Sequence, residues 1–164
     1  MAELWDASST IKDTVEDLLG KHHPEIASAS FGYAFKDKAT VAELEAGIVA
    51  MAKKVPPMYK LFSKDNLDFA IVVAKDMWDE LETAEQEAHL DSALCSCSVK
   101  LQEDGDFKLD AAGNPIYCLR AFDLQGHSEI LQRYGIDTFA EVGQRIRAAL
   151  GKTDDEDGPE DAEE

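Results

Sequence analysis

Positive charge is scarce in this sequence. Among its 164 residues, 16 are Lys or Arg and 34 are Asp or Glu, which gives a formal net charge of -18 at pH 7. Residues 153–164 hold eight acids and no base, so residues 1–152 alone still carry -10. Nucleic acids and anionic membranes are bound through Lys and Arg, so neither is expected as a direct ligand. A basic protein surface is the expected partner, unless the charge serves only solubility.

Cysteines and long apolar runs are also few. The three cysteines, Cys95, Cys97 and Cys118, are an odd number, and the first residues lack a basic segment followed by an apolar run. We therefore expect free thiols, no signal peptide and a cytoplasmic setting. No apolar run approaches the ~18 residues of a membrane span. Apolar residues nevertheless make up 45% of the chain, which is enough for one folded domain with a core.

The apolar pattern predicts an α+β fold over residues 1–151. Residues 67–74 are almost continuously apolar and rich in β-branched side chains, as in a central strand, and residues 28–35 alternate like a strand with one buried face. Residues 41–53 stay ambiguous, because their apolar residues alternate while their Ala and Glu content favours a helix. Helical spacing predicts helices at residues 8–20, 83–98, 124–133 and 138–150, and Thr83 is the expected N-cap of the second of these.

These elements predict a small mixed or antiparallel sheet packed with helices. Residues 99–109 are expected to form a hairpin around an Asp-Gly turn, and residues 116–122 a further strand. Residues 152–164 are too charged to fold on their own, so they are predicted to be a disordered acidic tail.

Several segments resemble one known family. Asp68-Phe69-Ala70-Ile71-Val72-Val73-Ala74 precedes Asp76-Met77-Trp78 and then a helix that contains Leu90-Asp91, and residues 52–59 and His23-Pro24 fit as well. Over residues 10–150 this order resembles the phage metallopeptidase family, a zincin-like group. The resemblance implies a zincin-like fold for residues 1–151 and, for a phage protein, the cytoplasm of the infected host cell.

The same resemblance implies a zinc site that this chain lacks. In the family the helix carries His-Glu-x-x-His, whose two histidines lie on one helix face and bind zinc while the Glu takes a proton from zinc-bound water. The resemblance places residues 92–96 at these five positions, and serine is a poor zinc ligand while alanine cannot act as a base. We therefore expect a pseudoenzyme with no catalytic residue, no metal and no cofactor. The vestigial positions would be Ser92, Ala93, Ser96 and Phe122, the last standing where a further His is expected.

Other metal sites look unfavourable from the sequence. Cys95 and Cys97 are two apart on an expected helix and so point about 200° away from each other. His89 has no ligand four residues further on, and the adjacent His22 and His23 are expected at a solvated helix end. An alternative also stays open, in which the helix at 83–98 is simply a core helix of an unrelated fold.

Three functions follow as hypotheses. The favoured one is an acidic binding inhibitor that imitates DNA phosphates and blocks a host nucleic-acid-binding or defence protein. The others are a zinc-dependent peptidase or hydrolase with an unorthodox site, and a structural or assembly protein. Candidate partner-binding acids lie in the tail and in the folded body: Asp154, Asp155, Glu156, Asp157, Glu160, Asp161, Glu80, Glu82, Glu85 and Glu87.

Overall fold

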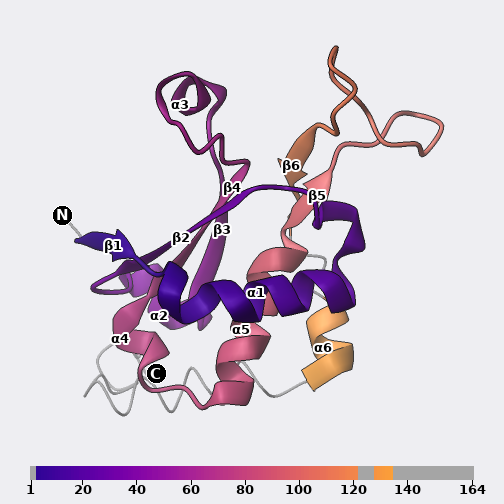
Figure 1. The fold of residues 1–164 in the computed structure, drawn as a ribbon. Coiled ribbons are helices and arrows are strands. Elements are labelled where there is room, and N and C mark those ends of the chain that lie inside the picture. The colour runs from indigo at the N-terminus through magenta and orange to yellow at the C-terminus, as the bar shows by residue number, and fades with distance from the viewer. Residues whose placement is uncertain (1–2, 122–127, 135–164) are drawn as a thin grey trace, which may run out of the picture.

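A four-stranded mixed sheet organises the molecule. The structure, a computed structural model, describes residues 3–121 and 128–134 (Figure 1). Its sheet has the strand order β1-β2-β4-β3, and β4 pairs in parallel with β2 and antiparallel with β3. The predicted α+β class and mixed sheet are therefore confirmed, with the strongest apolar run of the sequence at a central position. The strands are β1 (Leu4–Asp6), β2 (Phe31–Lys36), β3 (Ala50–Lys54) and β4 (Phe69–Ala74).

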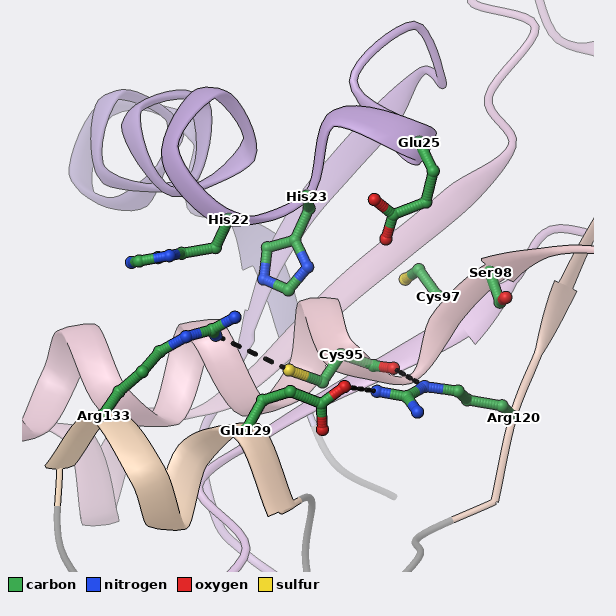
Figure 2. A pocket seen from close by; sticks show the side chains of 9 residues that line it. All are labelled: His22, His23, Glu25, Cys95, Cys97, Ser98, Arg120, Glu129 and Arg133. Carbon is green, nitrogen blue, oxygen red and sulfur yellow. Dashed lines mark hydrogen bonds and ion pairs between the residues drawn. The ribbon is translucent and has the colours of Figure 1, made fainter.

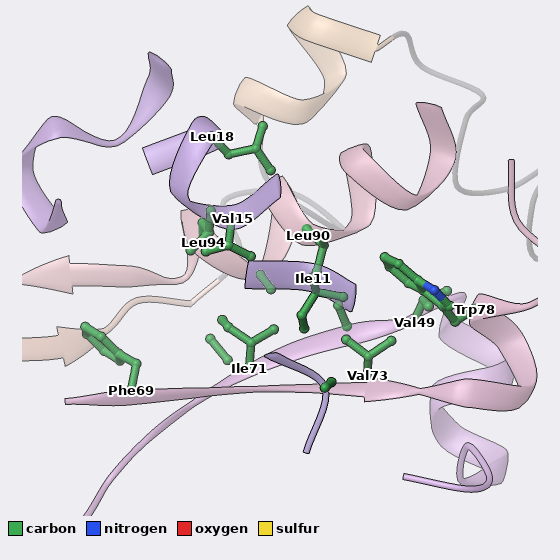
Figure 3. Packing of buried hydrophobic residues seen from close by; sticks show 14 of the residues in the cluster. Ile11, Val15, Leu18, Val49, Phe69, Ile71, Val73, Trp78, Leu90 and Leu94 are labelled. Atoms are coloured by element: carbon green, nitrogen blue, oxygen red, sulfur yellow. The ribbon is translucent and has the colours of Figure 1, made fainter. Parts of the chain in front are cut away.

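Two helices cover one face of this sheet and enclose the core. They are α1 (Ser8–His22) and α5 (Thr83–Cys95), and their apolar side chains point at β4 (Figure 3). Burying this apolar surface is the main favourable contribution to folding, and it fixes α5 against the sheet. The buried side chains at this contact are Ile11, Val15, Leu18, Phe69, Ile71, Val73, Leu90 and Leu94.

The ambiguous segment at residues 41–53 forms both a helix and a strand. Thr40 caps α2 (Val41–Ala46) through a reciprocal capping box with Glu43, and Gly47 ends the helix in the left-handed conformation. The chain then enters β3. Both signals in the sequence were real, because the Ala and Glu residues belong to the helix and the last alternating residues to the strand.

The remaining elements surround the core. A 3₁₀ turn (Pro24–Ile26) follows α1, and a second, two-stranded sheet joins the residues after α5 to a later segment. Figure 1 shows α3 and the arm between β5 and β6 projecting from the same side of the molecule. These elements are α3 (Pro57–Phe62), α4 (Lys75–Trp78), β5 (Cys97–Val99), β6 (Tyr117–Leu119) and α6 (Ser128–Tyr134).

Some predicted boundaries were wrong. Helix α5 ends at Cys95 and not at residue 98, because residues 97–99 pair with β6 as a strand. Its N-cap is Glu82, so Thr83 is the first helical residue. In the described part of the chain, no helix is both long and apolar enough to cross a bilayer. The predicted helix at 138–150 and the acidic tail lie outside the described residues.

Candidate functional site around helix α5

A fully buried carboxylate, Asp91, joins three helical segments. The ring Nε2 of His23 and Asp91 Oδ1 share a hydrogen bond of 2.5 Å, and Arg133 Nη1 donates to Asp91 Oδ2 at 2.6 Å. The hydroxyl of Tyr134 donates to the same Oδ2 at 3.1 Å. Asp91 itself is 0% exposed. The end of α1, the middle of α5 and the last residues of α6 are therefore linked through one side chain.

The turn after α1 places His23 in this cluster. His23 is the C-cap residue of α1, and Pro24 directly after it opens the 3₁₀ turn. A residue before proline is steered away from helical geometry, so the chain leaves the helix axis here and His23 turns inward. The expected solvated helix end was wrong for His23, which is 4% exposed, whereas His22 is only half-buried.

Cys95 is the third ligating side chain of the cluster. Asp91 and Cys95 are four residues apart on α5 and therefore lie on the same face of the helix. His23 Nε2, a carboxylate oxygen of Asp91 and Cys95 Sγ all lie within 4.8 Å of one another. Nitrogen, oxygen and thiolate sulfur are the donors that zinc takes in proteins. This set was not predicted from the sequence, because Cys95 was compared with Cys97 and not paired with Asp91.

Burial and charge set the protonation of the cluster. Burial opposes the charged form of Asp91, but the hydrogen bonds from His23 and Arg133 outweigh it, so the pKa of this carboxyl lies below its usual value. Burial raises the pKa of the Cys95 thiol to about 12, and the nearby Asp91 acts in the same direction while Arg133 opposes both. The cluster therefore combines a carboxylate with a neutral thiol when no other cation is bound.

A polar pocket of about 240 Å³ lies beside the cluster. Figure 2 shows His23 reaching from the end of α1 toward Cys95 on α5, with Arg133 on the side of α6. Arg120 closes one wall, where it donates to Glu129 and to the backbone carbonyl of Cys95. His23 and Cys95 both line this pocket, although each side chain is almost fully buried. The lining residues are His22, His23, Glu25, Cys95, Cys97, Ser98, Arg120, Glu129 and Arg133.

Of the predicted vestigial positions, Ser92 and Ala93 lie on α5 beside this cluster, and Ser96 is the C-cap of the helix. Ser92 and Ser96 are four residues apart and half-buried, so they share a face next to that of Asp91 and Cys95. Ala93 is 3% exposed and belongs to the core. Two hydroxyls and a methyl group are poor zinc ligands and offer no base. Phe122 lies outside the described residues.

The predicted acids of the body have different roles in the structure. Glu82 and Glu85 form a reciprocal capping box at the start of α5, in which Glu85 Oε1 accepts from the Glu82 backbone at 2.9 Å. Their positions are thus explained by helix capping. Glu80 is exposed beyond α4, and the predicted tail acids lie outside the described residues.

Glu87 belongs to an acidic groove between α1 and α5. The groove measures about 340 Å³, and Asp13 and Asp17 of α1 line it together with Glu87 and the ring of Trp78. Asp17 also pairs with Lys21 at 2.8 Å along the exposed surface of α1. The two aspartates were not predicted as site residues, although their spacing of four residues places them on one face of α1.

Comparison with known proteins gives one match. The model of the family described as "Putative phage metallopeptidase" matches residues 3–150. No curated protein and no solved structure matches the chain. The family match spans every described element, including the helix that carries Asp91 and Cys95.

Proposed function

Because the chain belongs to the putative phage metallopeptidase family, we propose that it is a non-catalytic member that acts by binding a basic protein surface. One observation carries the proposal. Helix α5, which the resemblance identifies as the zinc helix, presents Ser92, Ala93 and Ser96 at the expected positions of the two histidines and the catalytic glutamate.

The chemistry of peptide hydrolysis needs groups that these positions do not supply. Zinc must be held by good donors so that its bound water ionises near neutral pH, and a carboxylate must then take the proton. The methyl group of Ala93 is buried in the core and can accept no proton. The hydroxyls of Ser92 and Ser96 are weak neutral donors in place of imidazoles. Hydrolysis by the family's motif is therefore not expected.

The acidic groove supports binding as the remaining activity. Asp13, Asp17 and Glu87 line a groove large enough for a basic side chain, on a chain of net charge -18. Such a charge accelerates encounters with basic surfaces and gives them specificity. Proteins that bind DNA phosphates carry basic surfaces of this kind, so the proposed partner is a host nucleic-acid-binding or defence protein in the infected cell.

Capture from host lysate tests this function. The immobilised full-length chain should retain a nucleic-acid-binding protein that is released by salt and displaced by duplex DNA. A groove variant, Asp13→Asn/Asp17→Asn/Glu87→Gln, should lose this capture. The matched control is Glu103→Gln/Asp104→Asn/Asp106→Asn, which removes the same charge from the exposed arm and should retain it.

Two results would reject the proposal. If both triple variants lose capture equally, only the overall charge matters and the groove is not the binding surface. If the wild-type chain retains no protein that duplex DNA displaces, the chain does not act as a DNA-like inhibitor in that host.

A further inference from the structure

We propose that His23, Asp91 and Cys95 form a binding site for a transition-metal dication of the zinc class. The three ligand atoms lie within 4.8 Å of one another and all three residues are buried. This site is distinct from the positions of the family's motif, because Asp91 and Cys95 each stand one residue before Ser92 and Ser96 on α5.

Helix α5 supplies two of the three proposed ligands from one face. Side chains at i and i+4 project from one face of a helix, which is why histidines at that spacing share a zinc ion. Asp91 and Cys95 have the same spacing with a carboxylate and a thiol. His23, from the turn after α1, approaches this face from the opposite side and supplies the third donor (Figure 2).

The surrounding residues already form an outer shell. Metal-bound carboxylates are themselves held by hydrogen bonds, which orient them toward the ion. Arg133 and Tyr134 both donate to Asp91 Oδ2, which leaves Oδ1 directed at His23. Arg133 Nη1 also lies 3.9 Å from Cys95 Sγ, where its charge favours the thiolate that a metal ion requires. A Cys95 thiolate would add a second negative charge beside Asp91, whose own charge also pairs with Arg133.

Binding requires a small rearrangement and releases a proton. Donor atoms bound to one zinc ion at 2.0–2.3 Å stand roughly 3.3 Å apart in a tetrahedron, so the 2.5 Å separation of His23 and Asp91 must widen by about 1 Å. The ion takes the place of the proton between His23 Nε2 and Asp91 Oδ1, and this proton moves to Nδ1 of the ring or leaves to solvent. The Cys95 thiol forms a sulfur–metal bond and gives its proton to solvent through the adjacent pocket, which also supplies a water as fourth ligand.

Cobalt spectroscopy tests the site directly. The tag-free full-length chain is titrated with Co²⁺, because cobalt substitutes for zinc and gives a sulfur-to-metal absorption band in the near ultraviolet when a thiolate is bound. We expect about one equivalent to bind, with at least ~1 proton released per ion, and zinc to remove the band. The band should vanish in Cys95→Ser, and His23→Gln should weaken Co²⁺ binding by about 10-fold or more.

Cys97→Ser is the matched control. Cys97 is also buried and lines the same pocket, but its Sγ contacts the carbonyl of Ala93 at 3.8 Å and is not part of the cluster. This variant should keep the band. The proposal is wrong if the wild-type chain shows no thiolate band, if the band survives in Cys95→Ser, or if Cys97→Ser loses it as well.

Two further measurements keep these outcomes interpretable. Far-ultraviolet circular dichroism identifies a variant that fails to fold, and proton release by the wild-type chain needs no variant at all. Neither readout depends on peptide hydrolysis or on partner capture, so the site and the proposed function can each fail alone.

Discussion

Two neighbouring faces of helix α5 differ sharply in chemistry. The Asp91 side, made of Asp91 and Cys95, is buried and bonded to His23, Arg133 and Tyr134. The Ser92 side, made of Ser92 and Ser96, is half-buried and carries only hydroxyls. One residue along a helix is a rotation of about 100°, so the two sides face different surroundings although they adjoin in sequence.

The contrast is the basis for the proposal that this family member lacks peptidase activity. The family match covers the whole of α5. The proposal of a non-catalytic member rests on the resemblance that places Ser92, Ala93 and Ser96 at the motif positions, where they would supply neither the zinc donors nor the base. The proposed metal ligands Asp91 and Cys95 each lie one residue earlier.

Removing the Asp91 carboxylate should have the largest effect on stability. Asp91→Ala is expected to lower the free energy of unfolding by about 3–5 kcal/mol, because it leaves the partly buried charge of Arg133 without its anion. Urea denaturation at pH 7 measures this loss. A loss as small as that of an ordinary surface substitution would mean that the network contributes nothing to stability.

His89 should make stability depend on pH. Burial lowers the pKa of this imidazole to about 4, against 6.5 in the unfolded chain, so the unfolded state binds more protons between these values. Stability should therefore be full above pH 6.5 and fall by about 3 kcal/mol as the pH drops to 4. Denaturation at several pH values should show a shallower fall for His89→Leu, and an unchanged fall would contradict this assignment.

Tyr134→Phe should have an intermediate effect on stability. It removes one of the two donors to Asp91 Oδ2 and leaves Arg133 in place. A hydrogen bond to a charged group contributes about 1.5–3 kcal/mol, so we expect a loss near the lower value from urea denaturation. A loss equal to that of Asp91→Ala would show that Tyr134, and not Arg133, is the main partner.

Ser92→Ala should have the smallest effect on stability. Ser92 is half-buried on the face beside the cluster, and such substitutions usually change stability by about 0.5 kcal/mol or less. It should also leave the cobalt band unchanged. If this variant weakened metal binding as strongly as His23→Gln, the ion would lie on the Ser92 side and the contrast between the two faces would be wrong.

Local patterns predicted much of the fold. The run at residues 67–74 became the central strand β4, and the apolar spacing of α1 gave its buried residues Ile11, Val15 and Leu18. Both signals arise from neighbours along the chain. The end of α5 was predicted three residues too late, because pairing between β5 and β6 depends on a partner some twenty residues away.

The candidate site was harder to predict because its residues come from distant parts of the sequence. His23 and Asp91 are 68 residues apart, and Asp91 and Arg133 are 42 apart, so no local spacing reveals them. Only the pair Asp91 and Cys95 was visible in the sequence as an i, i+4 pair. Of the proposed acids, Glu87 lines the groove, but Asp13 joins it only through the packing of α1 against α5.

Peptide hydrolysis by the full-length chain is the most direct test of the proposal that this family member is non-catalytic. The tag-free chain is incubated with zinc and a mixed peptide library, and cleavage is followed by mass spectrometry with and without a chelator. We expect no chelator-sensitive cleavage, whether or not zinc binds at His23, Asp91 and Cys95. Chelator-sensitive cleavage that disappears in Cys95→Ser would contradict this expectation, and would make the cluster the active centre of a zinc hydrolase.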